Sequence, residues 1–167
     1  MKNSNQNILI ASISIGMLII AIVVIFLIKK FMYKSFLINP TAKKYRITSP
    51  FGRRTSPTTG ASTNHNGIDL ATPMRTPILA PADGTIGYVV TNDAGGLQVA
   101  IDIKDHDLRV GFAHLDEATV RNGQLVHKGD IIAYTGNSGR STGPHLHLTV
   151  KDSFGMQNPT KYFTYTT

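Results

Sequence analysis

The sequence predicts an all-β domain, an antiparallel sandwich or barrel-like fold, preceded by one N-terminal transmembrane helix. Two observations carry this prediction. After Arg46 the chain consists of short β-rich runs separated by Gly, Pro, Asn and Asp, a pattern typical of all-β folds. Before it, residues 8–28 form an uncharged apolar run, with Lys2 on one side and the pair Lys29-Lys30 on the other.

The apolar run is predicted to be an uncleaved membrane anchor. As a helix, residues 8–28 would rise about 1.5 Å per residue, enough for a hydrocarbon core of about 30 Å. A cleaved signal peptide is the alternative. Its apolar region is usually about 7–15 residues long and precedes a small-residue cleavage site, whereas Lys-Lys-Phe-Met-Tyr follows here at 29–33. We therefore expect a single-pass protein that contacts the lipid bilayer through residues 8–28.

Charge is distributed unevenly along the chain. The net charge is +7, and all of the excess lies at or before Arg46, a stretch without any acidic residue. Such a juxtamembrane excess suits anionic lipid head groups, and the balanced remainder argues against nucleic acid as a partner. Lysines 29, 30 and 34 on the C-terminal flank favour a cytoplasmic C-terminal domain, which conflicts with the function expected below.

The chain divides by composition into an anchor at 1–30, a basic tether at 31–45 and a β-rich domain at 46–167. A single helical turn is expected around residues 116–119. The predicted strands share alternating apolar residues bounded by turn residues. They are Thr76–Ala80, Gly84–Thr91, Gln98–Lys104, Leu108–His114, Asp130–Thr135 and His145–Lys151, with a short piece at Gln124–Val126.

Two histidines in the last of these strands suggest half of a metal site. His145 and His147 alternate with Leu146 and Leu148, so the imidazoles share one face while the leucines pack on the core. The chain contains no cysteine, which leaves His and acidic residues as the available zinc ligands. Spacing alone does not say which of the two histidines binds metal.

The other half of the site is expected from His65 and Asp69, four residues apart before a strand-like run. Together with one histidine of the pair they make three ligands and leave one position for water. Hydrolysis also needs a proton acceptor, and the unused histidine of the pair or His114 suits that role. His114 is expected to share a strand face with Val110 and Phe112.

Other polar clusters are interpreted as turns. The acidic and histidine-containing stretch at residues 102–107 reads as a solvated hairpin, and His127 with Asp130 as a turn between strands. Two Gly-rich polar loops, at 49–60 and 135–143, flank the two halves of the site and could form the walls of a groove.

Six segments resemble the lysostaphin-like zinc metalloendopeptidases, which cleave peptidoglycan cross-bridges, and they occur in the order found in that family. They are Phe51–Arg54 (FGRR), His65–Ala71 (HNGIDLA), Pro81–Ile86 (PADGTI), Ala113–Leu115 (AHL), Lys128–Ile132 (KGDII) and Thr135–His147 (TGNSGRSTGPHLH). The resemblance covers roughly residues 46–160 and implies the lysostaphin-type fold. Phe112 and Asn64 depart from the residues usual in the family, which bears on substrate preference more than on catalysis.

The resemblance also implies roles for individual residues. One zinc ion would be held by His65, Asp69 and His147, and His114 and His145 would be the catalytic pair. Arg54, Asn137 and Ser141 in the flanking loops are the expected substrate-binding residues.

By this resemblance the protein is expected to be a membrane-anchored zinc endopeptidase that hydrolyses peptide cross-links of bacterial peptidoglycan on the cell-wall side of the membrane. A host wall-remodelling enzyme and a phage or conjugation lysin both fit. The alternative is an inactive module of the same fold that binds peptidoglycan or activates another hydrolase. A biotinyl- or lipoyl-type carrier domain is a weaker alternative, since Lys128 is the only suitable lysine and lacks the usual neighbours.

Overall fold

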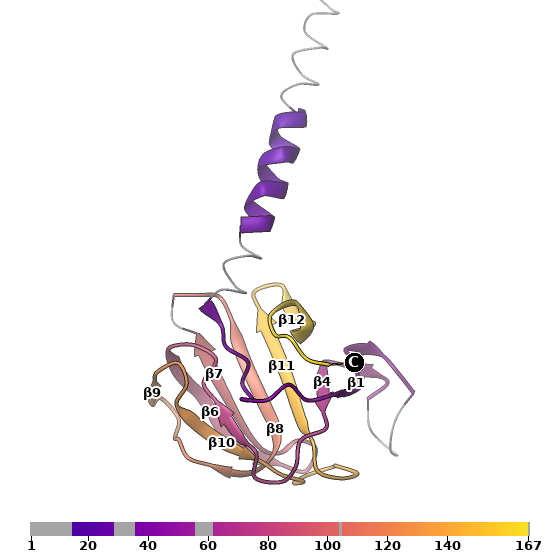
Figure 1. Ribbon diagram of the computed structural model, residues 1–167, viewed down its shortest axis with the longest axis vertical. Helices are drawn as coiled ribbons and strands as arrows, with labels where there is room; N and C mark the ends of the chain where they lie inside the picture. The colour runs from indigo at the N-terminus through magenta and orange to yellow at the C-terminus, as the bar shows by residue number, and fades with distance from the viewer. Residues whose placement is uncertain (1–14, 29–35, 56–61, 104, 167) are drawn as a thin grey trace, which may run out of the picture. The chain divides into compact units, whose positions relative to one another are not determined.

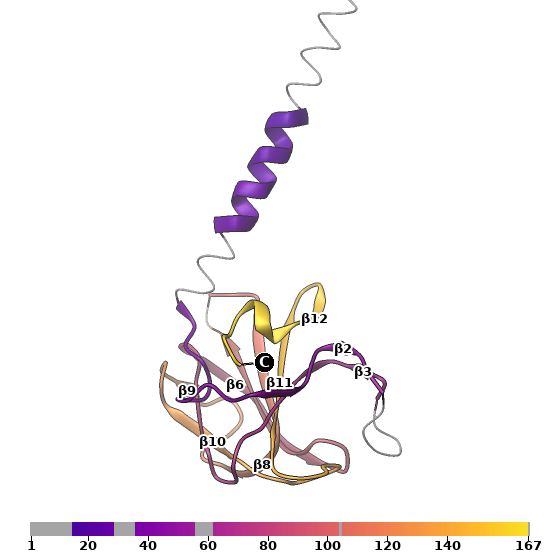
Figure 2. The same cartoon turned by 45° about the vertical axis from the view of Figure 1, so that its right-hand side comes forward.

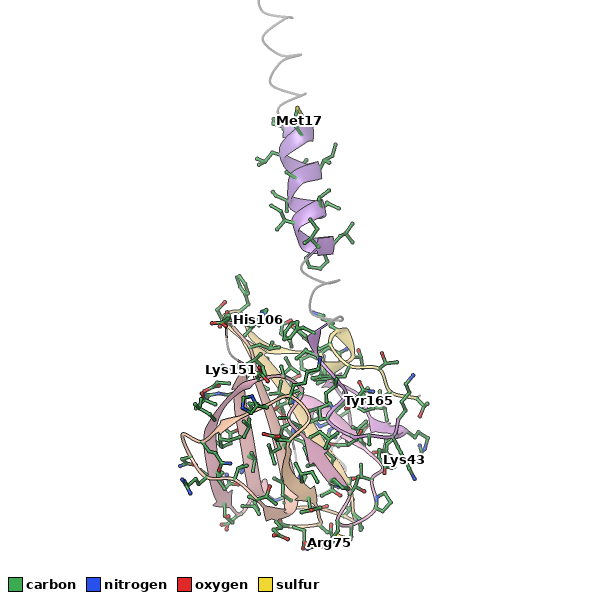
Figure 3. All side chains as sticks on the ribbon, turned by 60° about the vertical axis from the view of Figure 1, so that its left-hand side comes forward. Met17, Lys43, Arg75, His106, Lys151 and Tyr165 are labelled. Atoms are coloured by element: carbon green, nitrogen blue, oxygen red, sulfur yellow. The ribbon has the colours of Figure 1, made fainter. Side chains whose placement is uncertain are left out.

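The computed structural model describes residues 15–28, 36–55, 62–103 and 105–166. The chain divides into two compact units, Met1–Phe36 and Leu37–Thr167. In the first unit residues 15–28 form an α-helix, whose apolar side chains are exposed and project on all sides (Figure 3).

The predicted membrane anchor is covered only in part. Residues 8–14 lie outside the described residues, and residues 15–28 are helical. In the described ranges, no helix combines the length and apolar character needed to cross a membrane. The anchor over residues 8–28 therefore stays a prediction.

The second unit consists mainly of one twisted antiparallel sheet (Figure 1). Its strands are β1 (Ile47–Ser49), β4 (Gly67–Leu70), β5 (Pro77–Leu79), β6 (Gly84–Asn92), β7 (Gly96–Ile103), β8 (Arg109–Ala118), β9 (Leu125–Val126), β10 (Ile131–Thr135), β11 (Leu146–Asp152) and β12 (Gly155–Gln157). The order along the sheet is β1-β4-β11-β8-β7-β6-β9; β10 pairs with β8 and β5, and β12 pairs with β11. A separate hairpin of β2 (Gly52–Arg53) and β3 (Asn64–His65) stands beside it (Figure 2), and a 3₁₀ helix, η1 (Pro159–Lys161), follows β12.

The predicted antiparallel architecture is confirmed, but the barrel-like alternative is wrong. Among the described strands, the two that end the path, β1 and β9, pair only with β4 and β6, so pairing does not close the sheet. These end strands are three and two residues long, too short to continue a ladder around a barrel. Instead β10 and β5 extend the sheet beside the C-terminal half of β8.

The helical turn expected around residues 116–119 is also wrong. Residues up to Ala118 belong to β8, where Glu117 lies opposite Tyr134 of β10. Pairing with a neighbouring strand outweighs the weak local preference of this short segment. The six longer predicted strands all correspond to strands of the structure, with ends that differ by a few residues.

The apolar face of the sheet forms the core. In β11, Leu146, Leu148 and Val150 are fully buried, while His147 and Thr149 face the other way, as the alternation predicts. Each fully buried leucine stabilises the fold by about 1.5–3 kcal/mol. Because these residues fix the register of β11, they also fix the position of its histidines.

The segment before β1 belongs to this unit. The amide of Ile38 donates to the carbonyl of Pro81, and the carbonyl of Pro40 accepts from Leu79. The side chain of Leu37 is buried. Part of the stretch that the sequence assigns to a tether thus packs against β5 and the loop that follows it.

Candidate active site

Strand register brings the first two candidate ligands together. His147 of β11 lies directly opposite Asp69 of β4, so both side chains leave the same face of the sheet. Gly67 allows these strands to approach, because a Cβ atom there would lie 2.3 Å from the carbonyl oxygen of Leu148. The Nδ1 atom of His147 lies 2.8 Å from Oδ1 of Asp69.

His65 completes the group. It occupies β3, whose pairing with β2 places it opposite Gly52, and its side chain is 3% exposed. Its Nε2 atom lies 3.2 Å from Asp69 Oδ1 and 3.0 Å from His147 Nδ1. Two ligands about 2.0–2.1 Å from a shared tetrahedral ion would lie about 3.3 Å apart. The three side chains therefore form a group that could hold one metal ion.

The hydrogen-bond partners of the outer ring nitrogens support this fit. His65 Nδ1 lies 2.8 Å from the carbonyl oxygen of Pro50, which can only accept, so Nδ1 carries the proton. His147 Nε2 lies 3.1 Å from Oδ1 of Asn66. With both outer nitrogens protonated, the two inner nitrogens present lone pairs beside a carboxylate oxygen. A cation is the species that three converging lone pairs accommodate.

Electrostatics favours the metal-binding forms of two ligands. Burial acts to raise the pKa of the Asp69 carboxyl, but hydrogen bonds and charge attraction from His147 and His65, which act when their inner nitrogens carry protons, outweigh it and hold that pKa well below its usual range. The same two nitrogens give up those protons when they bind a metal ion. Burial lowers the pKa of His147, more strongly than Asp69 raises it. A carboxylate and a neutral imidazole are the forms that bind a metal ion.

Arg54 supports the carboxylate from the side away from the histidines. Its Nη1 atom donates to Asp69 Oδ2 at 2.9 Å and to Ser49 Oγ at 2.5 Å. The sequence predicts Arg54 to bind substrate. In the structure its guanidinium is engaged with a candidate metal ligand, which favours a positioning role.

A β-bulge directs His114 toward the same site. Leu115 lies opposite Leu97 of β7, but Phe112 lies opposite Val99, so β8 contains one extra residue between them. His114 has a φ of +62°, a left-handed conformation that is strained for a non-glycine residue. His114 also marks the point where β8 changes its pairing partner. β8 pairs with β11 up to Ala113 and with β10 from Leu115 onward.

The expected shared face of Val110, Phe112 and His114 is therefore wrong. Val110 and Phe112 are buried in the core, whereas His114 lines the groove that holds the other histidines. In a regular strand His114 would follow Phe112 to the core side. The bulge reverses its direction, and residue spacing gives no sign of it.

His114 and His145 lie side by side, with ring centroids 4.6 Å apart. Each ring is oriented by a carbonyl group: His114 Nδ1 lies 2.8 Å from the oxygen of Ser138, and His145 Nδ1 2.8 Å from that of Gly143. Both Nε2 atoms are therefore unprotonated in the neutral rings and free to accept a proton. His145 Nε2 lies 3.9 Å from Asp69 Oδ1, beside the metal-ligand group. Burial lowers the pKa of His114, which favours its neutral form.

Ser138 is a site residue that sequence reasoning missed. Its hydroxyl donates to the carbonyl of Leu115 at 2.6 Å and accepts from the amide of Leu97 at 3.0 Å, while its carbonyl orients His114. The neighbouring residue, Asn137, is exposed and is not among the described residues that line the groove. The predicted substrate contact of Asn137 therefore gains no support from the groove. The sequence of this Gly-rich loop contains no pattern that would show that Ser138, rather than Asn137, belongs to the site.

All five candidate ligand and catalytic residues line one open groove of about 750 Å³. Its walls include Arg54 and Ser141, both in the loops that the sequence predicts to flank the site. Ser141 Oγ also lies 3.1 Å from His145 Nδ1. A second hollow of about 260 Å³ continues from it, with Asn66 and His147 lining both.

The other polar clusters lie apart from the site, as predicted. Asp102 forms an ion pair with Arg109, an exposed cross-strand pair. His127 and Asp130 lie in the turn between β9 and β10, where the Asp130 carboxylate accepts from the His127 amide. His106 and Arg75 mark opposite ends of the folded unit (Figure 3).

Residues 63–159 match the family model described as "Peptidase family M23". The chain belongs to peptidase family M23. This M23 chain is 40% identical over 119 residues to the peptidoglycan DD-endopeptidase ShyB of Vibrio cholerae, covering 70% of this chain and 28% of that protein.

Solved structures show the same fold. A zinc-containing peptidase from Vibrio cholerae matches with a TM-score of 0.65 and 38% identity, over 73% of this chain and 38% of that one. The catalytic domain of lysostaphin from Staphylococcus simulans matches with a TM-score of 0.63 and 28% identity, over 70% of this chain and 90% of that one. The M23 chain thus has the lysostaphin-like fold. It spans less than a third of the length of the curated relatives that it matches. Its membership of a peptidase family removes the basis for the carrier-domain alternative.

Proposed function

We propose that this M23 chain is a zinc-dependent endopeptidase that hydrolyses peptide cross-links of bacterial peptidoglycan. The observation that carries the proposal is the convergence of His65, Asp69 and His147 beside His114 and His145 in one groove. A relative named as a peptidoglycan DD-endopeptidase and the fold of a lysostaphin catalytic domain support the choice of substrate.

Each of these five residues has a part in the proposed reaction. His65, Asp69 and His147 would hold the zinc ion, which when bound supplies a Lewis acid and makes a water molecule a better nucleophile near pH 7. One imidazole of the His114/His145 pair accepts the proton of that nucleophile through Nε2. The other, once protonated, donates a hydrogen bond to the oxyanion that develops on the scissile carbonyl.

Digestion of defined cross-linked muropeptides tests this function. The full chain, in detergent and supplied with zinc, is incubated with the muropeptides, and the products are identified by mass spectrometry. We expect a new amine and a new carboxylate at a cross-link, and no cleavage by the His147→Ala variant. A zinc-replete, folded chain that binds peptidoglycan without cleaving it would instead establish the inactive binding module.

We further propose that residues 8–28 anchor the chain in a membrane with the peptidase unit on the cell-wall side. The apolar run supports an anchor, and the substrate requires that side, against the orientation that the flanking lysines favour. The chain contains no cysteine, so a Phe154→Cys variant provides one label site at a residue that is 92% exposed. An impermeant thiol reagent should label it in intact spheroplasts; labelling only after lysis would place the unit in the cytoplasm.

A further inference from the structure

The four histidines of the site differ in what holds their outer ring nitrogen. Three of them face backbone carbonyls: His65 faces Pro50, His114 faces Ser138, and His145 faces Gly143, each at 2.8 Å. Backbone carbonyls are present whatever the side chain, so these three orientations depend on the fold.

His147 is the exception. Its outer nitrogen, Nε2, faces the side-chain oxygen of Asn66 at 3.1 Å. Asn66 lies in the one-residue step between β3 and β4, between the ligand His65 and Gly67. A Cβ atom at Gly67 would lie 3.0 Å from Cε1 of His147. Because Gly67 has no side chain, the His147 ring can pack against this segment.

We propose that Asn66 is a positioning residue that fixes the orientation and tautomer of the metal ligand His147; this rests on the proposed zinc site. The amide oxygen of Asn66 accepts the Nε2 proton. With the proton on Nε2, the Nδ1 atom keeps its lone pair. Nδ1 is the atom that lies 2.8 Å from Asp69 Oδ1 and 3.0 Å from His65 Nε2.

The opposite amide orientation would have the opposite effect. If Asn66 presented its NH₂ group, His147 Nε2 would accept and Nδ1 would carry the proton, which points it at the metal position. A ligand nitrogen that carries a proton cannot bind a metal ion. The oxygen-facing orientation is therefore the one that agrees with the rest of the donor set.

A graded series of variants tests this role, with zinc affinity of the full chain measured by competition with a chelator. Asn66→Leu has a similar size but no acceptor and blocks water, so we expect a loss of about 10- to 100-fold in zinc affinity. Asn66→Ala admits a water molecule as a substitute acceptor and should lose less. Asn66→Asp keeps an acceptor oxygen and should bind zinc at least as tightly as the parent.

Asn64→Leu is the matched control for zinc affinity. Asn64 is also exposed and lines the same groove, and its hydrogen bonds with Ser62 run through its backbone. We expect no change in zinc affinity from this substitution. Thermal melting of each variant in the absence of metal verifies that the fold is retained.

A second measurement does not depend on zinc or on peptidoglycan. Long-range ¹H–¹⁵N correlation spectra of the metal-free chain report which nitrogen of His147 carries the proton. Asp69 Oδ1 attracts the proton toward Nδ1, so both forms are expected, and the Nε2-protonated fraction should be larger in the parent and in Asn66→Asp than in Asn66→Leu. Unchanged zinc affinity and an unchanged tautomer in Asn66→Leu would overturn the proposal. Failure of the parent to cleave muropeptides, with the Asn66 series intact, would count against the proposed function alone.

Discussion

Replacement of His114 by Ala separates catalysis from metal binding. His114 is not one of the three side chains that could hold the ion, so zinc content should be unchanged. The Nε2 atom that we propose to handle a proton is lost, and such groups contribute about 10²–10⁴-fold to rate, or about 3–5 kcal/mol. We expect kcat to fall by that factor with little change in KM.

The cost to the fold should be much smaller. The variant loses one hydrogen bond, from His114 Nδ1 to the carbonyl of Ser138, which contributes about 0.5–1.5 kcal/mol. The left-handed φ of +62° is unfavourable for Ala as well as for His, so the strain in the bulge remains. A net loss near 1 kcal/mol leaves a domain of typical stability folded.

The assay is release of cleaved muropeptides by the zinc-loaded full chain, with zinc quantified in the same sample. His127→Ala is the matched control, because His127 is an exposed histidine in the turn between β9 and β10. It should match the parent in zinc content and rate. If His114→Ala cleaved muropeptides at the parental rate, the role assigned to His114 and the functional reason for its bulge would both be wrong.

Three further outcomes follow from the same geometry. Arg54→Ala removes the guanidinium from Asp69 Oδ2 and should weaken zinc binding about 10-fold, measured by chelator competition, whereas an unchanged affinity would show that Asp69 needs no support. Gly96→Ala should lower the midpoint of urea unfolding, because the added Cβ would lie 2.4 Å from the carbonyl carbon of Ser138 and the φ of Gly96 is +62°. We expect the free energy of unfolding to fall by about 2–4 kcal/mol, and a midpoint equal to that of the parent would refute the close approach. Burial lowers the pKa of His114 below about 6.5, so His114 stays neutral until the pH falls below that value. If His114 is the member of the pair that accepts the proton, the acid limb of kcat/KM should lie below about pH 6.5, and a limb above it would assign that role to His145.

The local pattern of residues was sufficient to predict much of the fold and of the site. Alternation of Leu and His in residues 145–148 predicts both the buried face of β11 and a pair of imidazoles directed to the opposite side, and both are found. The turn residues around His106 and Asp130 identify clusters that lie apart from the site. These predictions succeed because they depend on neighbours in the chain, for which strand period and turn chemistry are reliable guides.

Segments with little hydrophobic pattern were harder to predict. β1, β2 and β12 have two or three residues each and are held by pairing with partners far along the chain or across a hairpin. The helical turn expected near Asp116 fails for the same reason, since β10 recruits that segment into the sheet. The failure to close into a barrel likewise depends on which strands pair at the edges.

The sequence by itself determined the all-β class, the histidines and aspartate of the site, and the family resemblance, because residue type and local spacing carry that information. Only the tertiary structure decided that His114 turns toward the groove and that Arg54 braces Asp69. It alone placed Asn66 against His147. These contacts depend on an extra residue in β8 and on the register between β4 and β11, and register is set by the packing of whole strands against one another.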